Sequence, residues 1–162
     1  MQKVLLIDPE KCTGCRICEI WCSFFHEREC NPSKARIHVI KWEERGLDVP
    51  MVCQQCEIAV CQRVCPVGAI IRDSNTGAVI VNEDLCIGCR ICLAACPFGG
   101  CSINLDDKKV IKCDLCGGNP KCSEMCPREA IQYIPATRIV IKKKRASATK
   151  LSELIRKIAI PE

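Results

Sequence analysis

The cysteines of this chain constrain its fold more than any other feature. The sequence has 162 residues and 18 cysteines, and sixteen of the cysteines form four groups of four. A short chain with this much cysteine is held together by disulfides, zinc or iron–sulfur clusters rather than by an apolar core alone. In order along the chain, groups one to four are Cys12, Cys15, Cys18 and Cys22; Cys53, Cys56, Cys61 and Cys65; Cys86, Cys89, Cys92 and Cys96; and Cys113, Cys116, Cys122 and Cys126.

The spacing within the groups favours iron–sulfur clusters. Groups one and three read C-x2-C-x2-C-x3-C, and groups two and four lengthen only the gap before the third cysteine. In bacterial ferredoxins this spacing wraps three cysteines around one [4Fe–4S] cluster, and the fourth cysteine ligates a different cluster. Proline follows the fourth cysteine in three groups, whereas Ser23 follows Cys22. We interpret Ser23 as the sign of a longer helix at group one, not of a lost ligand.

The alternatives fit the spacing less well. A zinc ribbon also pairs C-x2-C motifs, but it needs neither a third cysteine two residues later nor a Cys-Pro ending. Neighbouring cysteines in C-x2-C-x2-C cannot all form disulfides with one another. A [3Fe–4S] centre would be indicated by a missing ligand, and no group lacks one. The sequence therefore favours four [4Fe–4S] clusters, with a structural zinc protein as the remote alternative.

The other residues of interest, outside the four cysteine groups, are expected to have structural roles. Cys30 and Cys101 are expected to be small buried hydrophobes, and His26 and His38 to be surface or core residues. Trp21, Phe24, Phe25 and Phe98 are expected to shield clusters from water. Glycines lie where the cluster loops need a positive φ or a close backbone approach, at Gly14, Gly88, Gly117 and Gly118.

Charge and hydropathy exclude several classes of protein. The first apolar run, residues 4–7, is too short for a secretory signal, and no stretch approaches the roughly 20 apolar residues of a membrane helix. We therefore expect a cytoplasmic protein without a membrane span. The net charge of +5 comes from residues 135–162, which carry eight Lys or Arg and two acids. Four clusters would add about −8 with their thiolates, so the basic pI does not indicate nucleic-acid binding.

Short strands and short helices are expected around the cysteine groups. Strand patterns cover residues 4–7, 36–41, 69–72, 78–81, 103–105 and 110–112. Residues 69–72 and 78–81 flank turn-forming residues, and so do residues 103–105 and 110–112. This arrangement predicts two hairpins. Helices are expected directly after the last cysteine of each group, with the clearest helical period over residues 19–29.

The C-terminal segment has a different pattern. A basic run, Lys142-Lys143-Lys144-Arg145, precedes apolar residues at helical spacing: Leu151, Leu154, Ile155 and Ile158. We predict a four-cluster domain over residues 1–134 and a basic tail with a short amphipathic helix over residues 135–162. The apolar face of this helix packs either on its own domain or on a partner.

The chain resembles the four-cluster ferredoxin-type subunits of multisubunit molybdenum and tungsten enzymes and hydrogenases. The resemblance rests on all sixteen cysteines in order, and on motifs such as Cys12-Thr-Gly-Cys15-Arg-Ile-Cys18 and Cys65-Pro-Val-Gly-Ala-Ile. The opening Ile7-Asp-Pro-Glu-Lys-Cys12, with Ser23-Phe-Phe-His26-Glu, is most similar to small partners of the tungsten aldehyde oxidoreductase family. That family includes the tungsten-containing benzoyl-CoA reductase.

The resemblance implies how the groups share their ligands. The fold it implies is α+β, with two interlocked two-cluster ferredoxin-like modules, short hairpins and short helices. Each cluster takes its fourth ligand from another group. We name the implied ligand sets site one (Cys12, Cys15, Cys18 and Cys126), site two (Cys53, Cys56, Cys61 and Cys96), site three (Cys86, Cys89, Cys92 and Cys65) and site four (Cys113, Cys116, Cys122 and Cys22).

The expected function is electron transfer without catalysis. Four clusters in one small domain form a row that carries single electrons to or from the tungsten or molybdenum pterin of a larger catalytic subunit, as in an aldehyde oxidoreductase or benzoyl-CoA reductase. A further electron donor or acceptor, such as a ferredoxin, is a second expected partner. The alternatives are a subunit of a formate dehydrogenase, hydrogenase or carbon monoxide dehydrogenase. An enzyme acting alone is disfavoured because every strong chemical signal is a cluster ligand.

Overall fold

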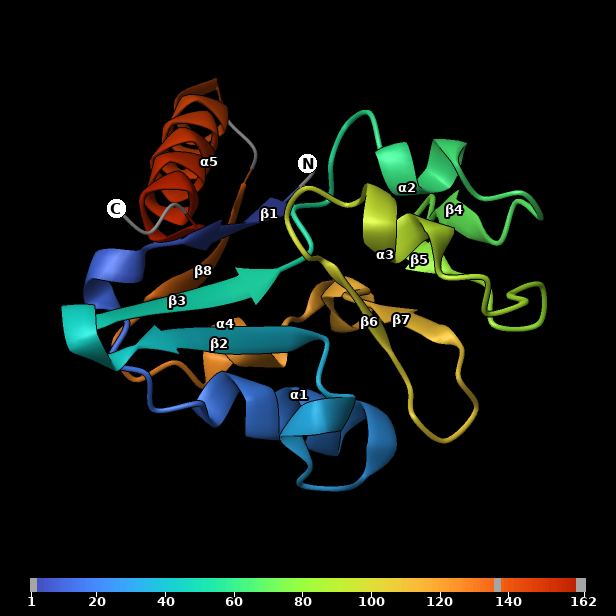
Figure 1. Cartoon of the computed structure of the whole chain (residues 1–162), viewed down its shortest axis with the longest axis horizontal. Helices are drawn as coiled ribbons and strands as arrows, with labels where there is room; N and C mark the ends of the chain where they lie inside the picture. The colour runs from blue at the N-terminus through green and yellow to red at the C-terminus, as the bar shows by residue number, and fades with distance from the viewer. Residues whose placement is uncertain (1–2, 136–137, 160–162) are drawn as a thin grey trace.

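The computed structural model describes residues 3–135 and 138–159, and within the last helix only part of the side chains. The described strands form four two-stranded antiparallel sheets, with short helices between them (Figure 1). The strands are β1 (Lys3–Ile7), β2 (Ile37–Trp42), β3 (Leu47–Val52), β4 (Ile70–Arg72), β5 (Val79–Val81), β6 (Cys101–Ile103), β7 (Val110–Lys112) and β8 (Ile131–Pro135). The helices are α1 (Ile17–Glu27), α2 (Val60–Arg63), α3 (Ile91–Ala95), α4 (Lys121–Glu124) and α5 (Arg138–Ala159).

The first and last strands pair with each other. β1 runs antiparallel to β8, from Lys3 opposite Pro135 to Ile7 opposite Ile131. Beyond the strands, the Asp8 amide donates to the Ala130 carbonyl at 2.8 Å. The pairing brings the segment before group one beside the segment after group four.

A second long pair, β2 and β3, lies over α1. β2 was expected from the sequence, but β3 was not, because Pro50 interrupts its pattern. Glu19 joins the helix to this hairpin, since its buried carboxylate accepts the Val39 amide at 2.5 Å. The helix face with Cys18 and Cys22 is therefore held against the sheet.

The two predicted hairpins both form. β4 pairs with β5 from Ile70 opposite Val81 to Arg72 opposite Val79, as predicted. The second hairpin pairs β6 with β7, and here the predicted start of the first strand is wrong. β6 begins at Cys101 instead of residue 103, and Cys101 lies opposite Lys112.

The positions predicted for the short helices are wrong. α2, α3 and α4 contain the third cysteine of their groups, Cys61, Cys92 and Cys122, and end before the fourth cysteine. The proline after each fourth cysteine explains this, because a residue before proline is disfavoured in the helical region. α1 has no such proline after Cys22 and continues to Glu27, where a left-handed Arg28 ends it.

Two apolar cores correspond to two halves of the domain. One core packs Leu5, Ile37, Val52, Leu115 and Ile131 around cysteines of groups one, two and four. The other packs Ala59, Ile70, Val79 and Val110 around Cys61 and Cys92. The α+β class, with short hairpins and short helices, is confirmed.

The C-terminal helix begins earlier than predicted and packs on its own domain. α5 has 22 residues and includes the basic run, and it lies alongside β1 (Figure 1). The Lys144 ammonium donates to the Gln54 carbonyl at 2.6 Å. Leu151 is half-buried and Ile155 is exposed, whereas the side chains of Leu154 and Ile158 lie outside the described residues. No helix in the described ranges is long and apolar enough to cross a membrane.

Candidate metal centres

The cysteines of site one come together around a small cavity. Cys12, Cys15 and Cys18 line it from one loop and the start of α1, and Cys126 lines it from the segment before β8. The loop turns tightly at Gly14, whose φ is +63°. This left-handed conformation favours glycine, and a β-carbon there would also displace the flexible ends of the Asp48 and Lys41 side chains.

The cysteines of site four line another cavity, one helical turn further along α1. Cys113, Cys116 and Cys122 come from the segment around α4, and Cys22 reaches them from α1. Burial raises the pKa of Cys122, and the thiols of Cys113, Cys22 and Cys116 raise it further. The helix thus carries Cys18 towards one site and Cys22 towards the next.

Cysteines of the predicted sites two and three also lie near one another across groups. Burial raises the pKa of Cys56, and the nearby thiols of Cys53, Cys96 and Cys61 add to this effect. For Cys92, burial is again the largest cause of a raised pKa, followed by effects that include the thiols of Cys61, Cys89 and Cys65. Cys86 packs in the same core as Cys65 and Cys92.

Backbone amides point at several of these sulfurs. The fourth cysteines of groups one, three and four accept hydrogen bonds from the amides of Arg36 (3.2 Å), Gly100 (3.3 Å) and Ala130 (3.3 Å), respectively. Such N–H groups stabilise thiolates and the negative charge of a cluster. The sulfur environment therefore suits anionic ligands.

The thiols also suit a metal that displaces protons. Burial raises the pKa of Cys18 to about 12 and the pKa of Cys22 to about 11. Without metal these thiols are neutral at pH 7, and metal binding releases their protons. Soft thiolate ligands in sets of four favour iron–sulfur clusters or zinc. The residues thus fit four [4Fe–4S] clusters, and the assignment of each cysteine as a ligand stays a prediction.

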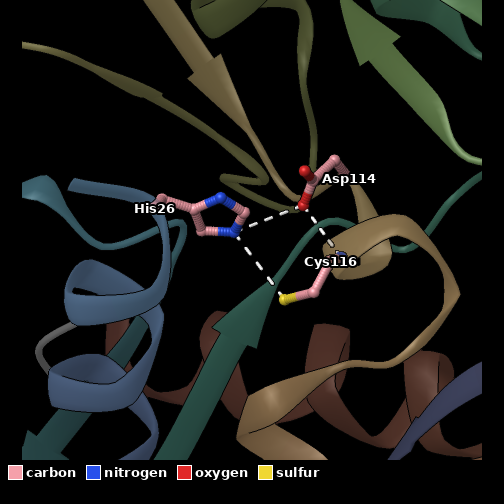
Figure 2. A group of neighbouring side chains, drawn as sticks. All are labelled: His26, Asp114 and Cys116. Carbon is pink, nitrogen blue, oxygen red and sulfur yellow. Dashed lines mark hydrogen bonds and ion pairs between the residues drawn. The ribbon is translucent and has the colours of Figure 1, made fainter. Parts of the chain in front are cut away.

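Site four has a histidine neighbour, His26, which the sequence analysis expected to be a surface or core residue. The His26 side chain is only 8% exposed, and its Nε2 lies 3.7 Å from Cys116 Sγ and 3.3 Å from Asp114 Oδ1 (Figure 2). Burial and the Arg36 guanidinium, which contacts Nδ1, lower the pKa of His26. The sequence contains a signal for this position, since His26 follows Cys22 by one helical turn and lies on the same face of the helix.

Site two has two neighbours with unusual chemistry. The buried Lys112 ammonium donates to Cys53 Sγ at 2.6 Å. The thiol of Cys101 lies within hydrogen-bonding reach of Cys61 and Cys96. This thiol is the main cause that lowers the pKa of Cys61 to about 6 and the pKa of Cys96 to about 5. The sequence analysis had treated Lys112 as an ordinary strand residue.

Other expectations for individual residues need correction. Cys30 is exposed rather than buried, because it lies beyond the end of α1. Phe24 and Phe25 are 41% and 36% exposed, more than expected for side chains that shield clusters from water. Phe98 is half-buried and lines a cleft with Cys56. His38 has a structural partner, the Ser102 hydroxyl, at 3.0 Å.

The four sites are linked in a row by neighbouring cysteines. Cys18 of site one is close enough to Cys122 of site four to affect its pKa. Cys53 of site two affects Cys113 of site four in the same way, and Cys61 of site two affects Cys92 of site three. With the ligand sets that the resemblance implies, these neighbouring cysteines give the order one, four, two, three.

Comparison with known proteins agrees with this architecture. Residues 45–131 match the family described as the 4Fe-4S dicluster domain. The polyferredoxin-like subunit of the aliphatic sulfonate oxidoreductase of Pyrococcus furiosus is 47% identical over 122 residues, which are 75% of this chain and 70% of that protein. The electron transport protein HydN of Escherichia coli is 36% identical over 164 aligned positions, covering 86% of this chain and 91% of HydN.

A solved structure shares the fold. It is a chain of the active site complex BamBC of benzoyl coenzyme A reductase with 1,5-dienoyl-CoA, with a TM-score of 0.50 and 24% identity over 96% of this chain and 97% of that chain. The fold and the cysteine sites together define a ferredoxin-type electron-transfer protein. The chain belongs to the 4Fe-4S dicluster family, and its cofactors are [4Fe–4S] clusters.

Proposed function

We propose that this chain carries electrons along four [4Fe–4S] clusters, in the order one, four, two, three, to or from a larger catalytic subunit. The observation that carries the proposal is the closeness of cysteines from successive sites. Cys18, Cys53, Cys113 and Cys122 share one core, and Cys61 and Cys92 share the other. When bound, such clusters each accept and release one electron. The protein holds them close together and partly excludes water from their ligands.

The catalytic subunit that we propose contains a tungsten or molybdenum pterin. The motifs of groups one and three resemble those of the small subunits of such enzymes, and the Pyrococcus furiosus relative is itself a subunit of an oxidoreductase. A formate dehydrogenase, hydrogenase or carbon monoxide dehydrogenase is the second candidate. The nested ligand sets, the division into residues 1–134 and 135–162 and a cytoplasmic location remain predictions.

Turnover with and without the partner tests this proposal. We expect the anaerobically purified chain to pass electrons from a low-potential reductant to a dye. It should not oxidise an aldehyde, formate or hydrogen, and it should not reduce an aromatic thioester, because a cluster with four thiolate ligands has no vacant position for a substrate. Activity should appear only with a larger, cofactor-bearing subunit. Turnover by the pure chain, with contamination excluded by mass spectrometry, would contradict the proposal.

A further inference from the structure

Site two differs from the other three sites in the charge that surrounds it. Among the side chains that the structure describes, Lys112 is the one fully buried cation, with 4% of its surface exposed. Its ammonium is aimed at Cys53 Sγ, 2.6 Å away. A second cation, Lys144, shares a cleft with Cys56.

Cys101 provides a second donor from the opposite strand. Cys101 and Lys112 are direct partners in the β6–β7 pair, so their side chains project from the same face of the hairpin. The Cys101 thiol reaches Cys61 and Cys96, while Lys112 reaches Cys53. Lys112 thus offers a donor to Cys53, and the single thiol proton of Cys101 can be donated to either Cys61 or Cys96.

The charges near site one are mixed, because Arg16 and Arg128 line the same cavity as the cysteines and Arg16 pairs with Glu19. The buried carboxylate of Glu19 lies beside Cys18, and the carboxylate of Asp48 lies near Cys12. At site four the charges are also mixed, because Asp114 and the Arg36 guanidinium lie together beside His26. Lys112 therefore distinguishes site two by a buried positive charge in direct contact with a ligand.

We propose that Lys112 and Cys101 make the centre at site two the most easily reduced of the four. Reduction adds one negative charge, which a nearby ammonium and hydrogen bonds to the sulfurs stabilise. Burial strengthens both effects, because the local dielectric constant is low. The first electron to enter the row then resides at site two, an inner position, and can leave towards either end. This inference rests on the proposed four-cluster assignment.

The test is a redox titration followed by electron paramagnetic resonance, with iron analysis of each sample. Lys112→Met should lower the highest midpoint potential and leave the other three unchanged. We expect a change of at least tenfold in the reduction equilibrium, which is about 59 mV for one electron. Lys112→Gln, which keeps a donor but loses the charge, should give a smaller decrease. Lys108→Met removes an exposed charge from the same hairpin and is the matched control.

A second pair of variants isolates the thiol. Cys101→Ala should lower the same midpoint, while Cys101→Ser, which keeps a donor, should shift it less. An unchanged highest midpoint in Lys112→Met with its iron retained would overturn the proposal, and so would a shift at a different centre. Loss of about four iron from both Lys112 variants would also overturn it, because Lys112 would then build the site rather than set its potential. An unmodified chain with fewer than four reducible centres would instead contradict the four-cluster assignment.

Discussion

Ile7 lies opposite Ile131 in the antiparallel pair of β1 and β8, although the two residues come from opposite ends of the cysteine-containing part of the chain. This pairing places Cys126 beside Cys12, Cys15 and Cys18. Because α1 also carries Cys22 towards Cys113, Cys116 and Cys122, we predict that groups one and four exchange their fourth cysteines. The predicted crossing is thus a consequence of strand pairing and of one continuous helix.

The crossed arrangement predicts the effect of Cys22→Ala. The variant should perturb the centre held by Cys113, Cys116 and Cys122, because Cys22 lines their cavity. The centre held by Cys12, Cys15 and Cys18 should keep its spectrum. Electron paramagnetic resonance of the reduced protein measures both, with Cys126→Ala as the reciprocal variant. A structure in which Cys22 shares a cluster with Cys12, Cys15 and Cys18 would contradict the crossing.

The two cysteines outside the groups should not be needed for assembly. Cys30→Ser should leave the iron content unchanged, since Cys30 is exposed beyond the end of α1. Cys101→Ser should also retain all the iron, because Cys101 contacts the sulfurs of site two without being assigned as a ligand. Iron and sulfide analysis checks both variants. Loss of about four iron from either one would mean that a ligand has been misassigned.

Gly100→Ala should damage site two specifically. A β-carbon at Gly100 would lie 2.7 Å from the Cys53 α-carbon, and backbone atoms cannot move aside cheaply. We expect loss of about four iron, with the other three centres retained. Gly99→Ala is the control, because its φ of +57° makes alanine strained but the surrounding space is open. That strain costs about 1–2 kcal/mol and should leave the iron in place. A full iron content in Gly100→Ala would refute the predicted displacement of Cys53.

Removal of residues 136–162 should weaken the fold without removing clusters. The truncation deletes α5 and with it the bond from Lys144 to the Gln54 carbonyl. We expect the full iron content and a thermal midpoint for cluster loss that is lower by about 2–8 °C. Lys150→Ala is the control, because its ion pair with Glu10 is exposed and contributes little. An unchanged midpoint after truncation would show that the packing of α5 on β1 does not stabilise the domain.

Local features of the fold could be predicted from the sequence, whereas long-range pairings could not. The turn residues around Gly77 and the alternating pattern on each side were enough for the β4–β5 hairpin. β8 was not predicted, and its pairing with β1 left no local signal, because strand patterns are compatible with many partners. β3 was missed because Pro50 obscured a strand that pairs only with β2.

The same distinction holds at the sites. Cysteine spacing identified the candidate ligands, because the loop around a cluster is local chemistry. Lys112 was missed because its partner, Cys53, is 59 residues away, and a lysine in a three-residue strand is normally solvated. His26 could have been found from its helical spacing to Cys22, but its contact with Cys116 depends on the packing of α1 against the segment before α4.

The iron content of the purified chain and the number of electrons that it takes up test the central claim most directly. The account predicts about sixteen iron and sixteen sulfide per chain, and uptake of about four electrons in an anaerobic reductive titration, one for each [4Fe–4S] cluster. About twelve iron with three electrons would show that one group does not bind a cluster. Stoichiometric zinc with no electron uptake would contradict the account entirely.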